Sequence, residues 1–408
     1  MIEVSSAAAP VPGGALQNYS PNQRCILQAI RAAGSITRAE LTRRSGLTLL
    51  TVTKTVARLL EDGLITEKGL LPSSGGRKAA LLSLNPHFRC VLAVDLGAGC
   101  VRAGVVGLDG TPVEYRILQK EYHMPARHAS PAELLEVLQG YLEKYGRDQI
   151  FGLGLGVSGI VKCRENRIVF CPNIEGWNNT DVAEVLGKPL GLPVFTDTSA
   201  RCMTLAEYML GAGRGSENLA CVSVGTSVSA GILEDGHLQR GASGAAGEIG
   251  HTTVRPDGAS CTCGNRGCLE LYVTLPSLLS KAGKLLAGSS SYSPLRQVMR
   301  PEHRTPTADE LLRGYELGDK IAREVMNGCA DTLGIALANL VNVVNPDKIV
   351  LGGASIEAFP FLTEAAERVI RERALVSHCE NLTVVRAGLG LLSAMTGAAL
   401  LAINAFLS

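Results

Sequence analysis

One short stretch of the sequence, residues 251–270, gathers side chains that can bind a metal. It contains His251, Cys261, Cys263 and Cys268, separated by short turns with Gly and Arg. One imidazole and three thiolates can close a tetrahedral Zn²⁺ site. Because protein side chains would fill all four positions and leave none for water, the predicted zinc is structural. The alternative is three free cysteines on a loop, which would leave a cluster of reactive thiols exposed.

Two acidic residues border this predicted zinc loop. Glu248 lies three residues before His251, and Glu270 lies two residues after Cys268. A metal that holds the loop rigid would also hold these two carboxylates in place. The loop therefore predicts a pair of fixed acidic groups beside the metal.

A third acidic residue, Asp197, lies in the segment VFTDTSARCMTLAE, where a predicted apolar strand is followed by a helix. As a structural residue it would cap the helix, which stabilises a helix by about 1 kcal/mol. As a functional residue it would accept the proton of a bound hydroxyl group. Its position in the sequence favours neither interpretation.

The elements that position these residues begin after residue 85, where strands and helices alternate. Strands are predicted in CVLAVDLGAG, CVRAGVVGLDG and TPVEYRILQK, then a helix in PAELLEVLQGYLEKYG and a strand in IFGLGLGVSGIV. A similar order restarts near LACVSVGTSVSAGIL. Two such halves predict two α/β lobes with a ligand cleft between them.

The N-terminal part predicts a flexible arm over residues 1–19 and a separate domain over residues 20–84. A first helix from Pro21 ends at Gly34, and Thr37 with Glu40 forms a capping box for a second helix. Thr48 caps a third helix with Val52, Val56, Leu59 and Leu60 on its buried face. Two short apolar strands around SSGGRK follow as a basic hairpin.

This arrangement predicts a winged helix-turn-helix that binds DNA. Residues 20–80 hold ten Lys and Arg against four Asp and Glu, a net charge of +6, whereas the whole chain has a net charge of +1. The third helix would enter the major groove, with basic side chains on phosphate. The predicted contact residues are Thr48, Thr51, Lys54, Arg58, Arg77 and Lys78. The alternative is a small helical bundle with a solvated basic face.

Composition and the termini limit the class of protein. With 408 residues, 46% of them hydrophobic and 19% charged, the chain can form large cores. The N-terminus lacks a basic segment before an apolar stretch, so no signal peptide is predicted. Nine of the twelve cysteines are scattered singly, as is typical of buried thiols in a reducing compartment. The apolar run GLGLLSAMTGAALLAINAF is rich in small residues that suit close packing inside a lobe. We predict a cytoplasmic protein without a membrane segment.

Two of these segments, GASGAAGEIGH and CTCGNRGCLE, resemble the signature of the ROK family, which joins sugar-responsive repressors and sugar kinases. The resemblance extends from Pro21 to the C-terminus, and the GGRK hairpin is similar to that of the repressor branch. It implies a two-lobed α/β domain of the actin-like ATPase (ribonuclease H-like) fold over residues 85–408, with a C-terminal helix packed back on the first lobe. It also implies zinc binding by His251, Cys261, Cys263 and Cys268. The residues implied to face a sugar ring are Asn173, Asp197, Glu248, His251 and Glu270.

The sequence departs from the kinase branch in both phosphate loops. Kinases of the family carry DxGGT, where this chain has Asp95-Leu-Gly-Ala-Gly99, and GTGxGxG, where it has Gly225-Thr-Ser-Val-Ser-Ala-Gly231. The first change removes a hydroxyl, and the second removes glycines that let backbone amides approach phosphate. We therefore expect no ATP or Mg²⁺, and Asp197 is at most a vestigial base. The degenerate nucleotide site comprises Asp95, Gly97, Gly225, Thr226, Gly352 and Gly353.

The resulting prediction is a transcriptional regulator, a repressor, that binds operator DNA and a sugar effector. A homodimer or homotetramer is expected from the two-fold symmetry of such DNA readers. Two alternatives stay open: an ATP-dependent sugar kinase that has kept a DNA-binding domain, and a scaffold that binds neither sugar nor operator. The residues do not identify the sugar, because different sugars would use carboxylates of this kind.

Overall fold

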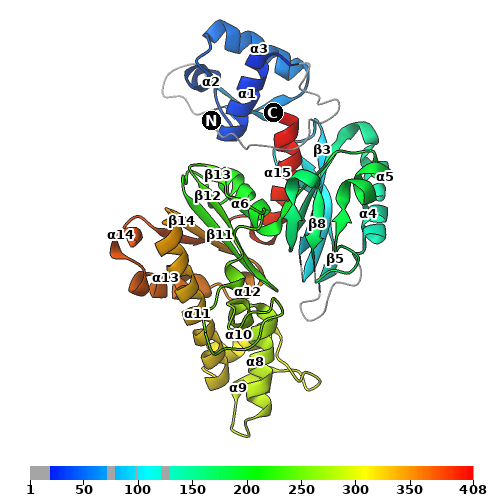
Figure 1. The fold of residues 1–408 in the computed structure, drawn as a ribbon. Helices are drawn as coiled ribbons and strands as arrows, with labels where there is room; N and C mark the ends of the chain where they lie inside the picture. Colours follow the sequence, from blue (N-terminus) through cyan, green and yellow to red (C-terminus); the bar gives the residue numbers. More distant parts are fainter. Residues whose placement is uncertain (1–18, 71–78, 98, 121–128, 172, 408) are drawn as a thin grey trace.

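The computed structural model describes residues 19–70, 79–97, 99–120, 129–171 and 173–407 (Figure 1). Most of the predicted N-terminal arm and the turn of the predicted basic hairpin, with Arg77 and Lys78, lie outside these residues. The division of the chain at residues 84 and 85 stays a prediction. We refer to the described part of residues 20–84 as the head.

The head contains α1 (Pro21–Ala33), α2 (Arg38–Ser45) and α3 (Leu49–Glu61), followed by the antiparallel strands β1 (Ile65–Leu70) and β2 (Ala80–Leu84). Each helix starts at a hydroxyl residue whose oxygen accepts a backbone N–H, as the sequence predicts for Thr37 and Thr48. The predicted capping box at Thr37 is only half formed, because the carboxylate of Glu40 pairs with Arg43 and Arg44 instead. The full box is at Ser20 and Gln23, on α1.

The first lobe is built on a five-stranded sheet in the order β10-β6-β3-β4-β5. Strands β3 (Cys90–Gly97), β4 (Cys100–Gly107) and β5 (Pro112–Lys120) form an antiparallel meander, as predicted, and β6 (Ile150–Val157) and β10 (Val194–Thr198) pair in parallel. The prediction of one strand over 150–161 was wrong, because the chain turns at Ser158 and Gly159 and continues as β7 (Ile160–Lys162). The strands β8 (Arg167–Phe170) and β9 (Thr180–Asp181) complete a small sheet with β7.

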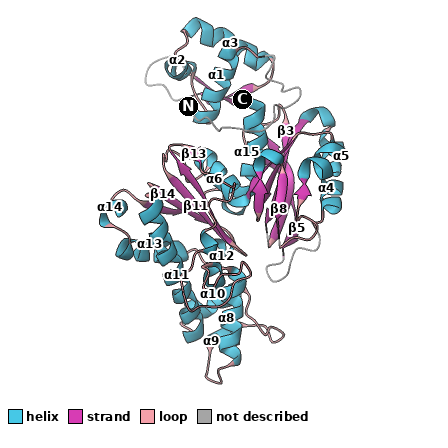
Figure 2. Ribbon diagram, in the orientation of Figure 1, coloured by secondary structure: helices cyan, strands magenta, loops and turns pink. Residues whose placement is uncertain are grey.

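The second lobe repeats this topology, with the order β13-β12-β11-β14-β15. Its strands are β11 (Leu219–Val224), β12 (Val228–Glu234), β13 (His237–Leu238), β14 (Lys348–Gly352) and β15 (Thr383–Arg386). In both lobes the first three strands are antiparallel and the last two are parallel additions on the other side of the first strand. This repetition confirms the two α/β halves expected from the sequence (Figure 2).

Most of the other helices cover the outer faces of the two lobes. On the first lobe these are α4 (Pro131–Tyr145) and α5 (Lys188–Leu190). On the second lobe they are α7 (Glu270–Val273), α8 (Leu275–Ala287), α9 (Pro294–Val298), α10 (Ala308–Glu316), α11 (Lys320–Val344), α12 (Ala354–Ala358), α13 (Leu362–Arg373) and α14 (Val376–Cys379).

Two helices, α6 (Ser199–Leu210) and α15 (Ser393–Leu407), lie between the two sheets and pack against each other (Figure 2). Helix α6 contacts strands of both lobes, and α15 packs on β3 and β6 of the first lobe. The apolar stretch Gly390–Leu407 is long enough to span a membrane, but 67% of it is buried inside the protein. This burial is what the small residues of that stretch predict for a core helix.

The head and the first lobe share one apolar core. Ile26, Leu27 and Ile30 of α1 belong to the same buried cluster as Ile403 and Phe406 of α15. The C-terminal helix therefore ends against the first helix of the head (Figure 1).

Candidate functional site

The four predicted metal ligands lie together in the structure. Their ligand atoms are all within 4.8 Å of one another, with 3.8 Å between Cys261 Sγ and His251 Nδ1 and 3.7 Å between Cys263 Sγ and Cys268 Sγ. Two ligands of a tetrahedral zinc, each about 2.0–2.3 Å from the metal, stand about 3.4–3.8 Å apart. The donor set and its spacing therefore fit zinc.

The loop that carries these ligands is held by its own backbone. Cys261 N donates to Asn265 O at 2.8 Å, and isolated bridges join Thr253 to Cys268 and Ser260 to Arg266. Gly267 has a φ of 68°, and a Cβ there would stand 1.7 Å from the carbonyl oxygen of Arg255, so only glycine fits. A hydrogen bond from the backbone of Asn265 lowers the pKa of Cys263, which favours the thiolate that a metal requires.

Two of the predicted sugar-binding carboxylates border the cluster, as the sequence predicts. Glu270 starts α7, and its Oε1 is 3.2 Å from Cys261 Sγ and 3.4 Å from His251 Nδ1. Burial raises the pKa of Glu248, while His251 and Arg201 lower it and Glu270 raises it further. Glu248 therefore lies close enough to His251 and Glu270 for their charges to change its pKa.

Asp197 is the last residue but one of β10, and its buried carboxylate is 1% exposed. It is not the helix cap: Thr198 caps α6, with its hydroxyl accepting from Arg201 N at 3.3 Å. Asp197 Oδ1 accepts from Thr198 N at 2.8 Å and from Cys163 Sγ at 3.3 Å. Both of its oxygens are also paired with arginines, Oδ1 with Arg201 Nε at 2.5 Å and Oδ2 with Arg240 Nη2 at 3.4 Å.

Arg201 was not predicted from the sequence, although it lies only four residues after Asp197, in the first turn of α6. Its side chain is 1% exposed, and it also donates from Nη1 to Gly244 O at 3.0 Å. Burial alone would lower the pKa of Arg201, but the charges of Asp197 and Cys163 raise it. Gly244 belongs to the glycine-rich segment before Glu248, so Arg201 joins the end of β10 to the loop that leads into the metal cluster.

Asn173 lies half-buried in the turn that follows β8. Its neighbourhood is fixed by the buried Trp177, whose Nε1 donates to Ala129 O at 2.7 Å, and by Asn178, whose Oδ1 accepts from Cys171 N. Among the described residues, no hydrogen bond joins Asn173 to the carboxylates of Asp197, Glu248 or Glu270. The structure thus places Glu248 and Glu270 beside His251 and connects Asp197 to Glu248 through the charge of Arg201, without linking the amide to any of them.

A cleft between the lobes contains five of the six residues that the sequence analysis assigns to the degenerate nucleotide site. Asp95, Gly97, Gly225, Thr226 and Gly353 line it together with Ser199 and residues 390–391, and its volume is about 90 Å³. Clefts that hold drug-sized ligands measure about 300–1,000 Å³. The enclosed part of the cleft is therefore smaller than such a ligand site.

Side chains of the protein occupy the floor of this cleft. Asp95 is buried, and it accepts hydrogen bonds from Arg102 at 3.3 Å and Ser199 at 2.8 Å. Burial raises the pKa of Asp95, and these two partners lower it in part. Gly352 lies outside the lining, where a Cβ would stand 2.7 Å from the methyl group of Met203. Close packing against Met203 therefore explains why position 352 is a glycine.

Gly231, the last residue of the second altered loop, also has a packing role. A Cβ there would stand 2.0 Å from Thr204 Oγ1 and 2.8 Å from Ala200 O, both on α6. The glycine thus allows β12 to lie directly against α6.

Four of the six predicted DNA-contacting residues, Thr48, Thr51, Lys54 and Arg58, lie on or at the start of α3, and Arg77 and Lys78 lie outside the described residues. Thr48 and Thr51 form the N-terminal cap of α3, with 2.9 Å between their hydroxyl oxygens. Lys54 is exposed, and Arg58 pairs at the surface with Glu61 and Asp62 at 3.6 and 3.3 Å.

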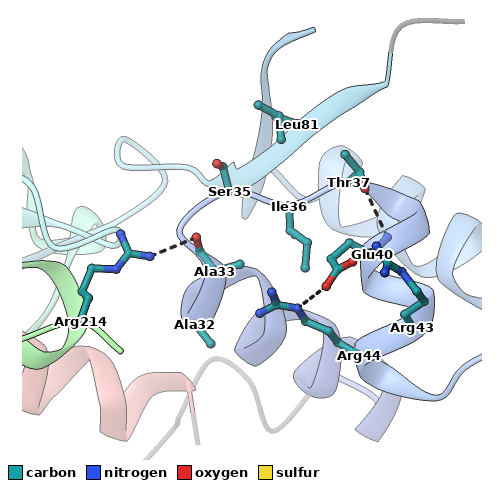
Figure 3. Close-up of a pocket in the computed structure, with 10 residues that line it drawn as sticks. All are labelled: Ala32, Ala33, Ser35, Ile36, Thr37, Glu40, Arg43, Arg44, Leu81 and Arg214. Atoms are coloured by element: carbon teal, nitrogen blue, oxygen red, sulfur yellow. Dashed lines mark hydrogen bonds and ion pairs between the residues drawn. The ribbon is translucent and has the colours of Figure 1, made fainter. Parts of the chain in front are cut away.

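The head also meets the second half of the chain in an open cavity of about 400 Å³ (Figure 3). Arg214, from the loop after α6, points to the end of α1 and donates to Ala33 O at 3.4 Å. Within α6 itself, Met209 Sδ is 3.4 Å from Arg31 Nη2. Helix α6 therefore extends from Asp197 at one end to the head at the other.

Comparisons with known proteins agree with these features. The model of the ROK family matches residues 91–405, and that of the winged helix-turn-helix DNA-binding family matches residues 20–66. The chain is 28% identical over 369 residues to the xylose repressor of Caldicellulosiruptor bescii, covering 89% of this chain and 90% of that protein. It is 30% identical over 385 residues to the DNA-binding transcriptional dual regulator NagC of Escherichia coli, covering 93% and 91%.

Among solved structures, a ROK family transcriptional regulator described as a homologue of the E. coli MLC protein superposes with a TM-score of 0.75 at 26% identity, covering 95% of this chain and 96% of that one. The match includes both the head and the two lobes. The chain thus belongs to the ROK family, in the branch of transcriptional regulators that carry an N-terminal winged helix-turn-helix.

Proposed function

We propose that this protein is a sugar-responsive transcriptional repressor that binds operator DNA through α3. The observation that carries the proposal is the exposed first half of α3, in a basic winged helix-turn-helix that is packed onto a ROK domain through a shared core. Exposed Thr, Lys and Arg side chains on such a helix suit base edges and phosphates. The protein would act in the cytoplasm, as a homodimer or homotetramer whose symmetry matches a palindromic operator.

The effector in this proposal is a sugar or sugar derivative bound beside the zinc loop. Carboxylates can accept hydrogen bonds from adjacent hydroxyl groups in a fixed geometry, and Glu248 and Glu270 lie together near His251. The relatives named for xylose and N-acetylglucosamine regulation support a sugar as the class of effector. Asn173 and Asp197 complete the proposed set of sugar-binding residues.

His251, Cys261, Cys263 and Cys268 would hold the zinc. When bound, the metal supplies rigidity, because all four of its positions are taken by the protein. The chain's own contribution is to hold Glu270 against two of the proposed ligands at 3.2 and 3.4 Å. The sugar-binding carboxylates are thereby oriented by the same loop that binds the metal.

Coupling between effector and DNA is proposed to pass along α6. The helix starts beside Asp197, carries Ser199 at the interlobe cleft and brings Met209 to Arg31 of the head. A sugar that binds one lobe arrangement more tightly than the other would shift the position of α6. A coupling of about 2 kcal/mol would change operator affinity about thirtyfold.

The alternative function, an ATP-dependent sugar kinase, is favoured only by the retention of Asp197. That carboxylate is paired with two arginines, and both phosphate loops depart from the kinase pattern at Gly99, Ser227 and Ser229. Phosphoryl transfer depends mainly on positioning phosphates and metal. We therefore propose a regulator whose nucleotide site is degenerate.

The test has two parts. Operator DNA is first selected from random duplexes with the full-length, zinc-loaded protein, and operator affinity is then measured with a panel of sugars. Isothermal titration with the same sugars, with and without an ATP analogue and Mg²⁺, distinguishes a sugar-responsive regulator from a sugar kinase. Sugar binding without nucleotide binding, with a changed operator affinity, is the expected result. Tight nucleotide binding with sugar turnover would instead support the kinase.

A further inference from the structure

Two large apolar side chains lie exposed on the first turn of α3. Leu49 is 59% exposed and Leu50 is 66% exposed, whereas Val52, Val56 and Leu59 of the same helix are completely buried and Leu60 is partly buried. Apolar surface that is exposed on a structured helix start commonly marks an interaction site. These leucines follow directly on Thr48, which fixes the helix start through its side chain.

The surroundings of the two leucines indicate what covers them. Lys54 follows about one turn later on the same helix and is exposed, and Arg58 lies one further turn along, where it pairs with Glu61 and Asp62. An apolar helix start that is followed by exposed basic side chains is complementary to a polyanion that presents an apolar group. The major groove of DNA fits this description, because thymine presents a C5 methyl group there and phosphates border the groove.

The hydroxyl groups at this end of α3 are already engaged. Thr48 Oγ1 accepts from Thr51 N at 3.2 Å and lies 2.9 Å from Thr51 Oγ1. Each hydroxyl group thus uses part of its hydrogen-bonding capacity within the helix cap. Apolar contact by Leu49 and Leu50 is therefore a further means, beside the remaining capacity of these hydroxyls, by which the first turn can distinguish base pairs.

We propose that Leu49 and Leu50 are specificity-determining residues that pack against thymine methyl groups in each operator half-site. This inference rests on the proposed DNA-binding function and specifies the chemistry that its recognition helix reads. The half-site must then contain one or two thymines opposite the first turn of α3. Their methyl groups, rather than their hydrogen-bonding edges, would be recognised.

The test replaces thymine by uracil, which removes only the methyl group. Duplexes of the selected operator carry dU at one thymine position at a time, and affinity is measured by fluorescence anisotropy at fixed salt concentration. We expect about a fourfold loss of affinity per methyl group at one or two positions of each half-site. Leu50→Ala should weaken binding to the thymine operator and abolish the difference between thymine and uracil at its position.

A matched control is Leu317→Ala, which truncates a leucine that is 60% exposed on the second lobe, and it should change neither affinity nor discrimination. Melting temperatures of all variants check the fold. Truncation of these exposed leucines should leave the melting temperature unchanged. The inference is overturned if uracil is tolerated at every position, if Leu50→Ala keeps the discrimination, or if Leu49→Ala and Leu50→Ala change the oligomeric state without DNA. A protein that binds no duplex at all overturns the proposed function as well, and that result differs from methyl-insensitive binding.

Discussion

Arg201, in the first turn of α6, and Asp197, near the end of β10, form an ion pair of 2.5 Å with both side chains 1% exposed. The pair places the positive charge of Arg201 beside the carboxylate of Asp197, which the sequence analysis considers as a possible base. With both oxygens bonded to arginines, this carboxylate is held in one position. We propose that its role in this chain is to anchor the sugar site.

The first prediction concerns the stability that this pair controls. Asp197→Asn leaves the buried Arg201 without its counter-charge, and breaking a buried pair from one side costs about 3–5 kcal/mol. We expect that loss in the free energy of unfolding, measured by urea denaturation of the zinc-loaded protein. Arg240→Ala, which removes the one-third exposed partner, should cost no more than about 1 kcal/mol. Equal stability of wild type and Asp197→Asn would contradict the anchoring role.

A second prediction concerns metal removal. Cys263→Ser should lower the zinc content per chain from one to none and should weaken sugar binding in parallel, because Glu270 is held by the same loop. Zinc is measured by atomic emission and sugar binding by calorimetry. Cys329→Ser, a buried cysteine of α11 remote from the cluster, is the control that should keep its zinc. Full sugar affinity in a zinc-free protein would disprove the link between the two.

The third prediction addresses the phosphate contacts of α3. Arg58→Ala should weaken binding to specific and unrelated DNA by a similar factor and reduce the slope of log affinity against log salt by about 1. Lys54 lies closer to the exposed end of the helix, so Lys54→Ala should also change the preferred sequence. Affinities over a range of salt concentrations distinguish the two variants. An unchanged salt slope in Arg58→Ala would remove that residue from the interface.

A fourth prediction follows from the raised pKa of Asp95, which burial causes. The unfolded chain releases this proton near pH 3.9, whereas the folded protein keeps it to higher pH. In that window the folded state binds more protons, so the contribution of Asp95 to stability falls as pH rises. The stability of Asp95→Asn relative to wild type should thus increase with pH, by at most about 1.4 kcal/mol per unit.

Denaturation of both proteins at several pH values above 4 measures this slope. The absolute difference also contains the lost pairing with Arg102, so only its pH dependence tests the raised pKa. A relative stability that is flat with pH, or that falls as pH rises, would show that Asp95 is ionised normally in the folded protein.

The fifth prediction tests the path along α6. Met209→Ala removes the contact with Arg31, and Arg214→Ala removes the contact with Ala33. Both leave α3 untouched, so operator affinity without sugar should stay within about threefold, whereas the sugar-induced change of about thirtyfold should shrink. Gel-shift titrations with and without the effector measure both quantities. Variants that respond to sugar as the wild type does would exclude this path.

Features set by neighbouring residues were predictable from the sequence. Thr48 and Thr37 cap helices through bonds that span three residues, and the spacing of Cys261, Cys263 and Cys268 is short enough to indicate a common ligand. The duplicated strand order follows from hydrophobic patterns that recur in the two halves.

Features that depend on side-chain direction were not predictable. The half-formed capping box failed because Glu40 turns to two arginines on its own helix. Arg201 is an ordinary helix residue until the fold directs it back to Asp197, and Gly231 resembles a phosphate-loop glycine until α6 is seen against it. Helical spacing alone would have suggested the pair of Asp197 and Arg201, but not its burial.

The packing of α15 against α1 sets the order in which the protein can be completed during synthesis. Phe406 lies in the same core as Ile26, and these residues are separated by nearly the whole chain. Residues near position 406 are thus needed to seat a helix that is made from residues 21–33. A nascent chain can form the caps of its head early, but the docked repressor exists only after α15 has been synthesised.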